Sequence, residues 1–443
     1  MKLTLIKPNM GRMTAGQPYV DEGRMEPLQL GVLAGLTPPD VEVVLYDDRF
    51  EEIPYDEQTD LVALTVEAFT ARRSYEICLE YRKRRVPAII GGMHPTLLPE
   101  EAAQHADSIF LGDAEHLWQQ VIDDARTGCL RSVYRSHPGA PQPGTFTRRD
   151  IFCDKGYLPI TLLQFGRGCR FTCQFCAVSA YFEHTAYQRC ICEVVEEIER
   201  QDRKLLFFVD DNIVAEHQAA KDLFRALIPL NVRWVGQGSI DMTEDRELME
   251  LMVASGCLGN VIGFEAVTEA GLEALNKSPN LLGFDYYERA IRILEEFGLQ
   301  TWAAFVLGHD QETAESLDQT LAFALEHKFC FAAFNILMPY PRTPWYQQLQ
   351  TEQRLLYDGC WWLHPDYRFN HAAFAPNNLS PAELTERCFA MRTRWNSYST
   401  LLKRLFNLKT NMRSLAKMGI FLRYNPLFRK ETFKKQGMRL GEK

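Results

Sequence analysis

Short apolar runs alternate with longer segments of helical pattern along most of this chain, and this alternation restricts its fold more than any other feature. In residues 1–130 the runs are rich in β-branched residues and as short as buried strands usually are. Alternating β and α units predict a parallel sheet with helices on both faces, and such sheets bind ligands at the carboxyl ends of their strands. We expect these strands at residues 2–6, 41–46, 61–66, 87–90 and 108–111.

A second set of alternating units, with a longer period, begins near residue 158. Six β/α units are too few for a closed eight-stranded barrel but suit an open or partial one, whose chemistry again lies at the strand carboxyl ends. Its strand candidates are residues 160–164, 205–209, 232–235, 260–264, 302–307 and 334–338.

A Pro/Gly-rich stretch at residues 137–144 separates the two sets and indicates a linker. Beyond residue 377 the pattern is helical and begins with the capping signal Ser380-Pro381-Ala382-Glu383. The sequence therefore predicts an α/β protein of three parts: a Rossmann-like domain at 1–140, a partial (β/α)6 barrel at 150–350 and a mostly helical region at 351–443.

Composition narrows the class of protein. No stretch of the 443 residues approaches the roughly 18 consecutive apolar residues of a transmembrane helix, and the first residues are too short an apolar run for a secretory signal. We therefore expect a cytoplasmic protein. The twelve cysteines are then expected to be thiols or metal ligands and not a disulfide framework.

Charge is distributed unevenly. From Lys403 to Lys443 there are twelve Lys/Arg and two Asp/Glu, so this segment carries +10 and, since the net charge is −9, the rest carries −19. Bulky apolar residues lie among these cations, a pattern that fits either a terminal helix packed on the acidic body or peripheral contact with an anionic membrane. The acidic body disfavours binding to nucleic acid.

Three cysteines, Cys169, Cys173 and Cys176, follow the first strand of the second set at C-x3-C-x2-C spacing. Closely spaced Cys thiolates are the ligands of iron–sulfur clusters, and three ligands leave one iron of a four-iron cluster open for a substrate or cofactor. The spacing alone leaves two alternatives: buried structural cysteines, and a zinc site with Cys190, Cys192 or His184 as the fourth ligand.

This triplet, with an aromatic residue before its last cysteine, resembles the signature of the radical S-adenosylmethionine (SAM) superfamily. The resemblance continues at successive strand ends over residues 158–346, in FFVDDN at 207–212, WVGQGS at 234–239, SGC at 255–257, GFE at 263–265 and PYPRTP at 339–344, although Arg342 replaces a common Gly. It implies a [4Fe–4S] cluster on Cys169, Cys173 and Cys176 that reductively cleaves SAM to a 5′-deoxyadenosyl radical. SAM would then contact Phe175, Asp210, Asp211, Ser239, Glu265 and Gly308.

The first domain is similar to the cobalamin (B12)-binding domain that often precedes this barrel, through GGMHPT at 91–96, PEE at 99–101 and GDAE at 112–115. The Asp-x-His-x-x-Gly motif that supplies a cobalt ligand in other B12 proteins is absent. We therefore favour the interpretation of His94 as a hydrogen-bonding residue at the start of a turn or helix over its interpretation as a metal ligand. The resemblance places cobalamin on loops that contain Thr65, Glu67, Gly91, Gly92, His94, Gly112 and Glu115.

Together these resemblances imply a radical SAM enzyme that modifies an unactivated C–H bond, by cobalamin-dependent C-methylation as the sharpest hypothesis. A radical oxidoreductase or cyclase without methyl transfer, and a non-catalytic Fe–S or zinc protein, are the alternatives. The expected partners are a small-molecule or lipid substrate and a reductant such as flavodoxin or ferredoxin.

Overall fold

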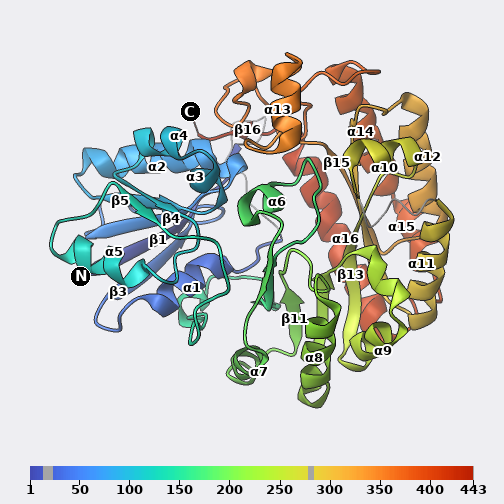
Figure 1. Cartoon of the computed structure of the whole chain (residues 1–443), viewed down its shortest axis with the longest axis horizontal. Coiled ribbons are helices and arrows are strands. Elements are labelled where there is room, and N and C mark those ends of the chain that lie inside the picture. The colour runs from blue at the N-terminus through green and yellow to red at the C-terminus, as the bar shows by residue number, and fades with distance from the viewer. Residues whose placement is uncertain (13–22, 278–283, 443) are drawn as a thin grey trace. The chain divides into compact units, whose positions relative to one another are not determined.

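A computed structural model describes residues 1–12, 23–277 and 284–442, and Figure 1 shows its elements in chain order. The chain forms two compact units. The N-terminal unit comprises Met1–Leu158, Tyr357–Phe369 and Gly437–Lys443, and the barrel unit comprises Pro159–Leu356 and Asn370–Gln436.

The N-terminal unit is built on a six-stranded parallel sheet of order β3-β1-β4-β5-β6-β7. Its strands are β1 (Lys2–Lys7), β3 (Glu42–Asp47), β4 (Leu61–Thr65), β5 (Ala88–Gly91), β6 (Ser108–Leu111) and β7 (Val133–Arg135). The four central strands are short runs of mostly buried apolar residues, as a sheet covered on both faces needs, whereas the edge strands β3 and β7 are partly exposed.

Helices cover both faces of this sheet, as the sequence predicts. Figure 1 shows α2 (Ala71–Lys83), α3 (Met93–Leu97) and α4 (Pro99–His105) on one side, with α1 (Leu28–Leu36) and α5 (Trp118–Arg126) on the other. Because β1 lies between β3 and β4, the chain reverses its direction of winding there, and a crevice outside the carboxyl ends of β1 and β4 is expected.

The barrel unit has a second six-stranded parallel sheet, of order β15-β14-β13-β12-β11-β8. The two edge strands do not pair with each other in the part of the chain that the structure describes, so the sheet is a partial barrel. Its strands are β8 (Thr161–Leu163), β11 (Leu205–Phe208), β12 (Arg233–Gln237), β13 (Cys257–Glu265), β14 (Gln300–Leu307) and β15 (Phe331–Ile336).

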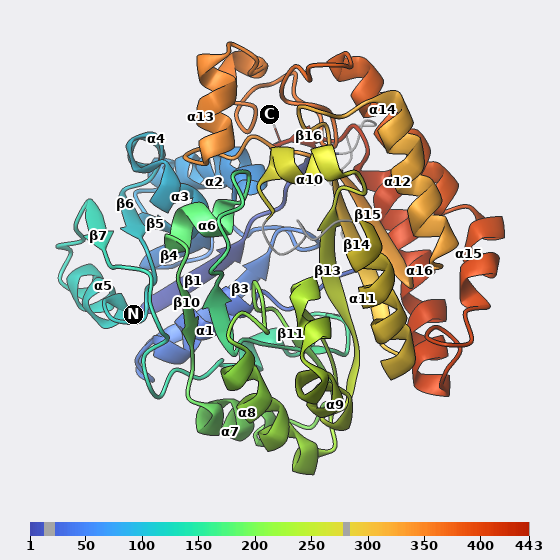
Figure 2. The same cartoon turned by 45° about the vertical axis from the view of Figure 1, so that its right-hand side comes forward.

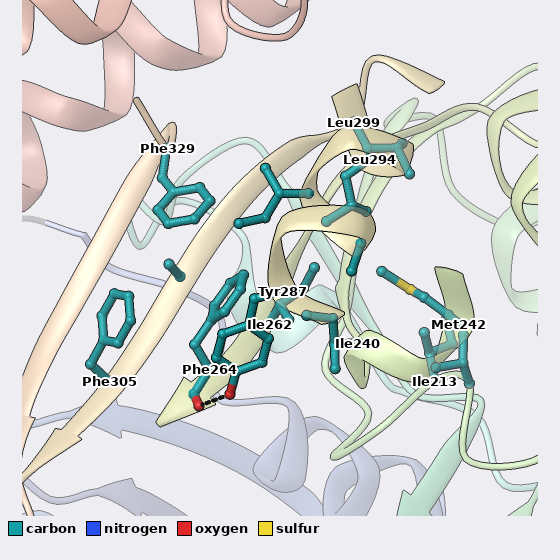
Figure 3. Packing of buried hydrophobic residues seen from close by; sticks show 14 of the residues in the cluster. Ile213, Ile240, Met242, Ile262, Phe264, Tyr287, Leu294, Leu299, Phe305 and Phe329 are labelled. Carbon is teal, nitrogen blue, oxygen red and sulfur yellow. Dashed lines mark hydrogen bonds between the residues drawn. The ribbon is translucent and has the colours of Figure 1, made fainter. Parts of the chain in front are cut away.

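Helices follow these strands and enclose an apolar core. They are α7 (Ile191–Glu199), α8 (His217–Leu227), α9 (Arg246–Ala254), α10 (Glu269–Leu275), α11 (Phe284–Phe297), α12 (Ala314–Glu326) and α13 (Pro344–Thr351). Figure 3 shows Phe264 of β13 packed among Ile262, Tyr287 and Phe305, with the Tyr287 hydroxyl donating to the Phe264 carbonyl at 2.6 Å. Phe264 thus fixes the end of β13, from which Glu265 emerges.

The unit boundaries differ from those predicted. The Pro/Gly-rich stretch lies inside the N-terminal unit, because the chain after it still packs there: the Arg148 amide donates to the Gly31 carbonyl at 3.0 Å, and Phe152 joins that unit's core. The C-terminal region is shared between the units, since residues 357–369 belong to the N-terminal unit, as does β16 (Arg439–Leu440), which pairs with β2 (Gly11–Arg12).

Three helices, α14 (Pro381–Trp395), α15 (Tyr398–Leu405) and α16 (Leu415–Lys435), complete the barrel unit. Figure 2 shows them along one side of the β13–β15 strands. Ser380 caps α14 as its sequence signal predicts, accepting from the Glu383 amide at 3.1 Å. Among the described residues, no helix is both long and apolar enough to cross a membrane.

Candidate active site

The three cysteines of the C-x3-C-x2-C triplet lie in one loop of the barrel unit. Cys169 directly follows β9 (Gly166–Gly168), which pairs in antiparallel fashion with β10 (Ala186–Gln188), and Cys176 is the N-cap of α6 (Ala177–Phe182). The hairpin of β9 and β10 therefore forms a short neck between the barrel strand β8 and the cysteine loop. Sequence patterning did not predict this hairpin.

Two carboxylates at the end of β11 hold that neck. Asp210 is buried, and its two carboxylate oxygens accept from the amides of Phe165 and Gly166 at 2.9 and 2.7 Å. Burial raises the pKa of Asp210 to about 7, and the two amide donors act against that rise. Asp211 accepts from the Gly168 amide at 2.7 Å, one residue before Cys169. Both side chains, predicted as SAM ligands, thus contact the backbone of the cysteine loop.

Asn212 and Ser239 join the ends of two neighbouring strands, β11 and β12. The Asn212 amide group donates to Ser239 Oγ at 3.0 Å, and the Ser239 backbone N–H donates to Asn212 Oδ1 at 3.2 Å. The Asn212 side chain also interacts with the Cys169 thiol. Asn212 therefore belongs to the site, although the sequence pattern singled out only its neighbours.

A buried ion pair lies next to the cysteines. Glu265 ends β13 with φ +66°, an uncommon conformation for a residue other than glycine, and its carboxylate accepts from Lys277 Nζ at 2.6 Å. A Cβ on Gly263 would lie 2.2 Å from the Glu265 carboxylate and 2.9 Å from Lys277 Nζ, so a side chain at this position would displace the ion pair. Lys277 was missed because it follows α10 in a segment with no motif.

The electrostatics of the loop are those of buried thiols beside one cation. Burial raises the pKa of Cys173 to about 11, while the positive charge of Lys277 acts in the opposite direction. Burial likewise raises the pKa of Cys169. A Cys173 thiol with this pKa stays protonated at neutral pH, so the charge of a bound metal is what would convert it to a thiolate.

The donor set fits an iron–sulfur cluster better than a single metal ion. Cys190 and Cys192 are bonded to each other at the start of α7, so neither is a free fourth ligand. His184 Nδ1 lies 3.2 Å from the Phe171 carbonyl oxygen. Nowhere in residues 1–12, 23–277 and 284–442 do three His, Cys, Asp or Glu side chains converge tightly enough for one ion. A four-iron cluster is larger and accepts more widely spaced thiolates.

Two further predicted SAM contacts have defined surroundings. Phe175 lies in the cysteine loop, half-buried, and packs against the barrel core. Gly308, with φ +99°, follows β14, and a Cβ there would lie 2.6 Å from the Leu384 side chain and 2.9 Å from that of Phe374. Its lack of a side chain is thus required by packing within the unit.

In the N-terminal unit, the predicted cobalamin loops gather at the carboxyl ends of β4, β5 and β6. Gly92 and Gly112 both have positive φ, and a Cβ on either would collide with a neighbouring backbone oxygen, of Val66 at 2.9 Å or of Ser136 at 2.1 Å. Thr96 links the loops, since its hydroxyl donates to the Gly92 carbonyl at 2.8 Å and accepts from the Gly112 amide at 3.0 Å. Gly91 ends β5 with no such collision.

His94 is fully buried at the start of α3 and is held by a carboxylate. Its Nε2 lies 3.0 Å from Glu101, which also accepts from the Tyr75 hydroxyl at 2.8 Å and from the Trp362 indole at 2.9 Å. Its Nδ1 is buried and has no hydrogen-bond partner among the residues that the structure describes. This network occupies the imidazole on one side and leaves no exposed ring nitrogen for a metal.

The remaining predicted residues lie around the expected crevice. Thr65 is buried at the end of β4, and Glu67 follows it with its carboxylate 3.0 Å from Lys7 Nζ, at the end of β1. This ion pair joins the two strands between which the winding reverses. Glu115 is half-buried in the turn after β6.

Comparison with known proteins agrees with this geometry. The family model of the radical SAM superfamily matches residues 163–324. A bacteriochlorophyllide d C-12(1)-methyltransferase of Chlorobaculum tepidum is 28% identical over 87% of this chain and 86% of its own length.

Two solved structures share the fold. The radical SAM methyltransferase TsrM of Kitasatospora setae, with cobalamin and a [4Fe–4S] cluster bound, is 18% identical, covers 87% of this chain and 81% of its own, and has a TM-score of 0.63. The cobalamin-dependent SAM radical enzyme OxsB is 13% identical, covers 97% of this chain and 71% of its own, and has a TM-score of 0.65.

The matched residues run from the last residue of β8 into α12 and include the cysteine loop, the ends of β11 to β13 and Lys277. The barrel unit is therefore a radical SAM domain, and the chain is a radical SAM enzyme. Its overall fold, with a Rossmann-like unit before the barrel, is that of the radical SAM enzymes with a B12-binding-type domain. The predicted fold class is confirmed.

Proposed function

We propose that this enzyme binds a [4Fe–4S] cluster, SAM and cobalamin and transfers a methyl group to a carbon atom of a small or lipid-like organic substrate. The observation that carries the proposal is the juxtaposition of three cysteines in one loop with a buried carboxylate–ammonium pair. The likeness to a methyltransferase over 87% of the chain supports the kind of reaction.

Cys169, Cys173 and Cys176 hold the cluster in this proposal, and the cluster supplies the electron that cleaves SAM. Glu265 and Lys277 recognise the charged amino-acid end of SAM, because a carboxylate suits its ammonium and an ammonium suits its carboxylate. The Glu265–Lys277 pair satisfies both buried charges when SAM is absent. Asn212 and Ser239, bonded to each other beside Cys169, are placed to accept from or donate to SAM's polar groups.

The N-terminal unit holds cobalamin by packing and backbone hydrogen bonds in this proposal. Gly92, Gly112 and Thr96 build the loops at the carboxyl edge, and His94 is committed to Glu101. His94 would therefore not serve as a metal ligand to bound cobalamin, which agrees with the absence of the Asp-x-His-x-x-Gly motif.

The experiment is anaerobic purification from cells supplied with hydroxocobalamin, followed by measurement of iron, sulfide, cobalt and SAM cleavage. We expect about four irons and four sulfides per chain, a visible corrinoid spectrum and release of 5′-deoxyadenosine. The Cys169→Ala, Cys173→Ala, Cys176→Ala variant should lose iron and SAM cleavage together.

Methyl transfer is tested with SAM carrying a deuterated methyl group and a panel of acceptors that starts with bacteriochlorophyllide d, the substrate in the related enzyme's name. Stoichiometric zinc without iron would contradict the cluster. SAM cleavage without cobalt, or a product without the label, would contradict the methyltransferase and support an oxidoreductase or cyclase.

A further inference from the structure

Bulky apolar side chains are exposed on one part of the barrel unit. Among the described residues, the other large exposed apolar side chains are scattered, at Leu79, Val133, Ile228 and Val253, and none is more than 45% exposed. Six more lie within a single segment of α15 and α16 and their connection. We call these six the apolar face: Tyr398 (73% exposed), Leu402 (57%), Phe406 (57%), Leu408 (72%), Leu415 (83%) and Leu422 (51%).

Helical spacing places five of these residues in two stripes, and Leu408 lies in the connection between the helices. Tyr398, Leu402 and Phe406 are four residues apart, so they follow one side of α15 and its C-cap. Leu415 and Leu422 are seven residues apart and share one side of α16. Gly419 and Pro426, also exposed, extend the second stripe without adding a charge.

The opposite sides of both helices are buried against the barrel and each other. Arg404 is 1% exposed, donates to the Cys330 carbonyl at 2.8 Å and stacks 3.8 Å from the Trp395 ring centre. It also reaches Asn425 of α16 at 3.3 Å. One side of α15 and α16 thus packs against the rest of the barrel unit, and the apolar face lies on the side that does not take part in this packing.

The segment that carries the apolar face is rich in cations, although Glu295 of α11 lies beside it and pairs with Lys409. Residues 387–430 contain eleven Lys/Arg and no Asp/Glu. Arg404 and Lys417 donate to buried backbone carbonyls. Lys403 and Arg423 are exposed beside the two stripes and form no ion pair within the described residues. A soluble partner would need an acidic, apolar surface, whereas an anionic lipid surface offers both chemistries at once.

We propose that the apolar face docks the enzyme on anionic membranes, with its leucines and aromatic rings at the level of the headgroups and acyl chains and Lys403 and Arg423 near lipid phosphates. Exposed apolar patches of this kind usually mark an interaction surface. This inference does not rest on the proposed function, because it uses no residue of the active site.

The test is flotation of the full chain with vesicles of phosphatidylcholine, with and without phosphatidylglycerol. We expect binding to the mixed vesicles that weakens with salt. Leu402→Ser, Phe406→Ser, Leu408→Ser should lower the partition coefficient at least roughly tenfold. Lys403→Gln, Arg423→Gln should lower it by about fivefold for each cation. Leu79→Ser with Val133→Ser, and Lys204→Gln, are the matched controls at exposed positions elsewhere.

Each variant is first checked for an unchanged thermal midpoint, so that loss of binding is not loss of folding. Binding by the chain and the controls, reduced in both test variants, supports the proposal. No binding to the mixed vesicles overturns it, as does equal binding by all variants. Concentration-dependent dimerisation that the serine variant abolishes would assign the face to a second copy of the chain and also overturn it.

Discussion

At the scale of single residues, carboxylates at the ends of different barrel strands differ in what they contact. Asp210 and Asp211 accept hydrogen bonds from the backbone that leads into the cysteine loop, whereas Glu265 pairs with the Lys277 ammonium. A sequence shows that a carboxylate ends a strand, but not whether backbone amides already occupy its oxygens. SAM binding by Asp210 and Asp211 remains a prediction, and support of the loop is the role that their contacts favour.

Asp210→Asn should weaken the neck of the cysteine loop. An amide side chain has one oxygen, so one of the two amide donors would face an NH2 group, at a cost of about 1–3 kcal/mol. We expect a lower thermal midpoint of the apoprotein and reduced iron after reconstitution. Asp222→Asn on the exposed side of α8 is the control. Wild-type iron content and midpoint in Asp210→Asn would show that the neck does not depend on this carboxylate.

The same carboxyl group predicts a pH dependence. Its folded pKa of about 7 lies above the ordinary aspartate value of 3.8, so between these values the folded apoprotein keeps a proton that the unfolded chain has lost. Stability from this group is therefore present below pH 4 and falls as pH rises toward 7, by at most about 1.4 kcal/mol per pH unit. Urea unfolding of wild type and Asp210→Asn should show this fall in the difference between them.

The Glu265–Lys277 pair predicts a loss of SAM binding that is separate from cluster binding. Either single substitution leaves a buried charge unpaired, so the informative variant removes both charges, as Glu265→Gln with Lys277→Met. We expect SAM affinity to fall roughly 10- to 100-fold, since charged hydrogen bonds contribute about 1.5–3 kcal/mol each, with iron content unchanged. Anaerobic calorimetry measures the affinity; wild-type binding by the double variant would refute the assigned role.

At the scale of elements, apolar runs located every strand of the two six-stranded sheets except β7, whose middle residue alone is buried. The strands β13, β14 and β15 begin two or three residues earlier than predicted. Burial on both faces explains this success, because it demands continuous apolar residues. The β9–β10 hairpin was missed since Gly166-Arg167-Gly168 has no apolar alternation. The predicted boundary at residues 137–144 differs from the division into units for a related reason: a Pro/Gly-rich stretch marks a turn in the chain, and only the packing of Phe152 shows which core the chain re-enters.

Arg404 links the C-terminal helices to the barrel strands and offers a test at this scale. Burial lowers the pKa of Arg404 to about 9, and its guanidinium donates to the carbonyls of Phe329 and Cys330, just before β15. Arg404→Met keeps the apolar stem but removes these donors, which should cost about 1–3 kcal/mol of unfolding free energy. Hydrogen exchange should rise in α15 first. Arg394→Met, a substitution at an exposed position of α14, should change neither the unfolding free energy nor the hydrogen exchange of α15.

At the scale of the whole molecule, the N-terminal unit depends on residues from three parts of the chain. Met438 and Leu440 are buried, and Glu442 lies 3.2 Å from Arg73 of α2. Truncation after Gln436 should therefore destabilise residues 1–158, since burying each such apolar side chain contributes roughly 1.5–3 kcal/mol. Limited proteolysis should cut the N-terminal unit faster, while iron loading of the barrel unit persists. Unchanged proteolysis there would contradict this division of the chain.

The pairing of β16 with β2 also determines the order in which the two units can fold during synthesis on the ribosome. Arg439 pairs with Arg12, so the partner strand of β2 is synthesised only after both sheets are complete. All residues of the barrel unit precede Gly437, so this unit can finish folding before the N-terminal unit does. For most of translation the N-terminal unit cannot complete its interior, because the buried residues Trp361, Trp362 and Leu440 have not yet been synthesised. The residues that are synthesised first thus stay accessible to chaperones and proteases for longest. When each domain is one continuous segment, the N-terminal domain is expected to fold first, so the order here is the reverse.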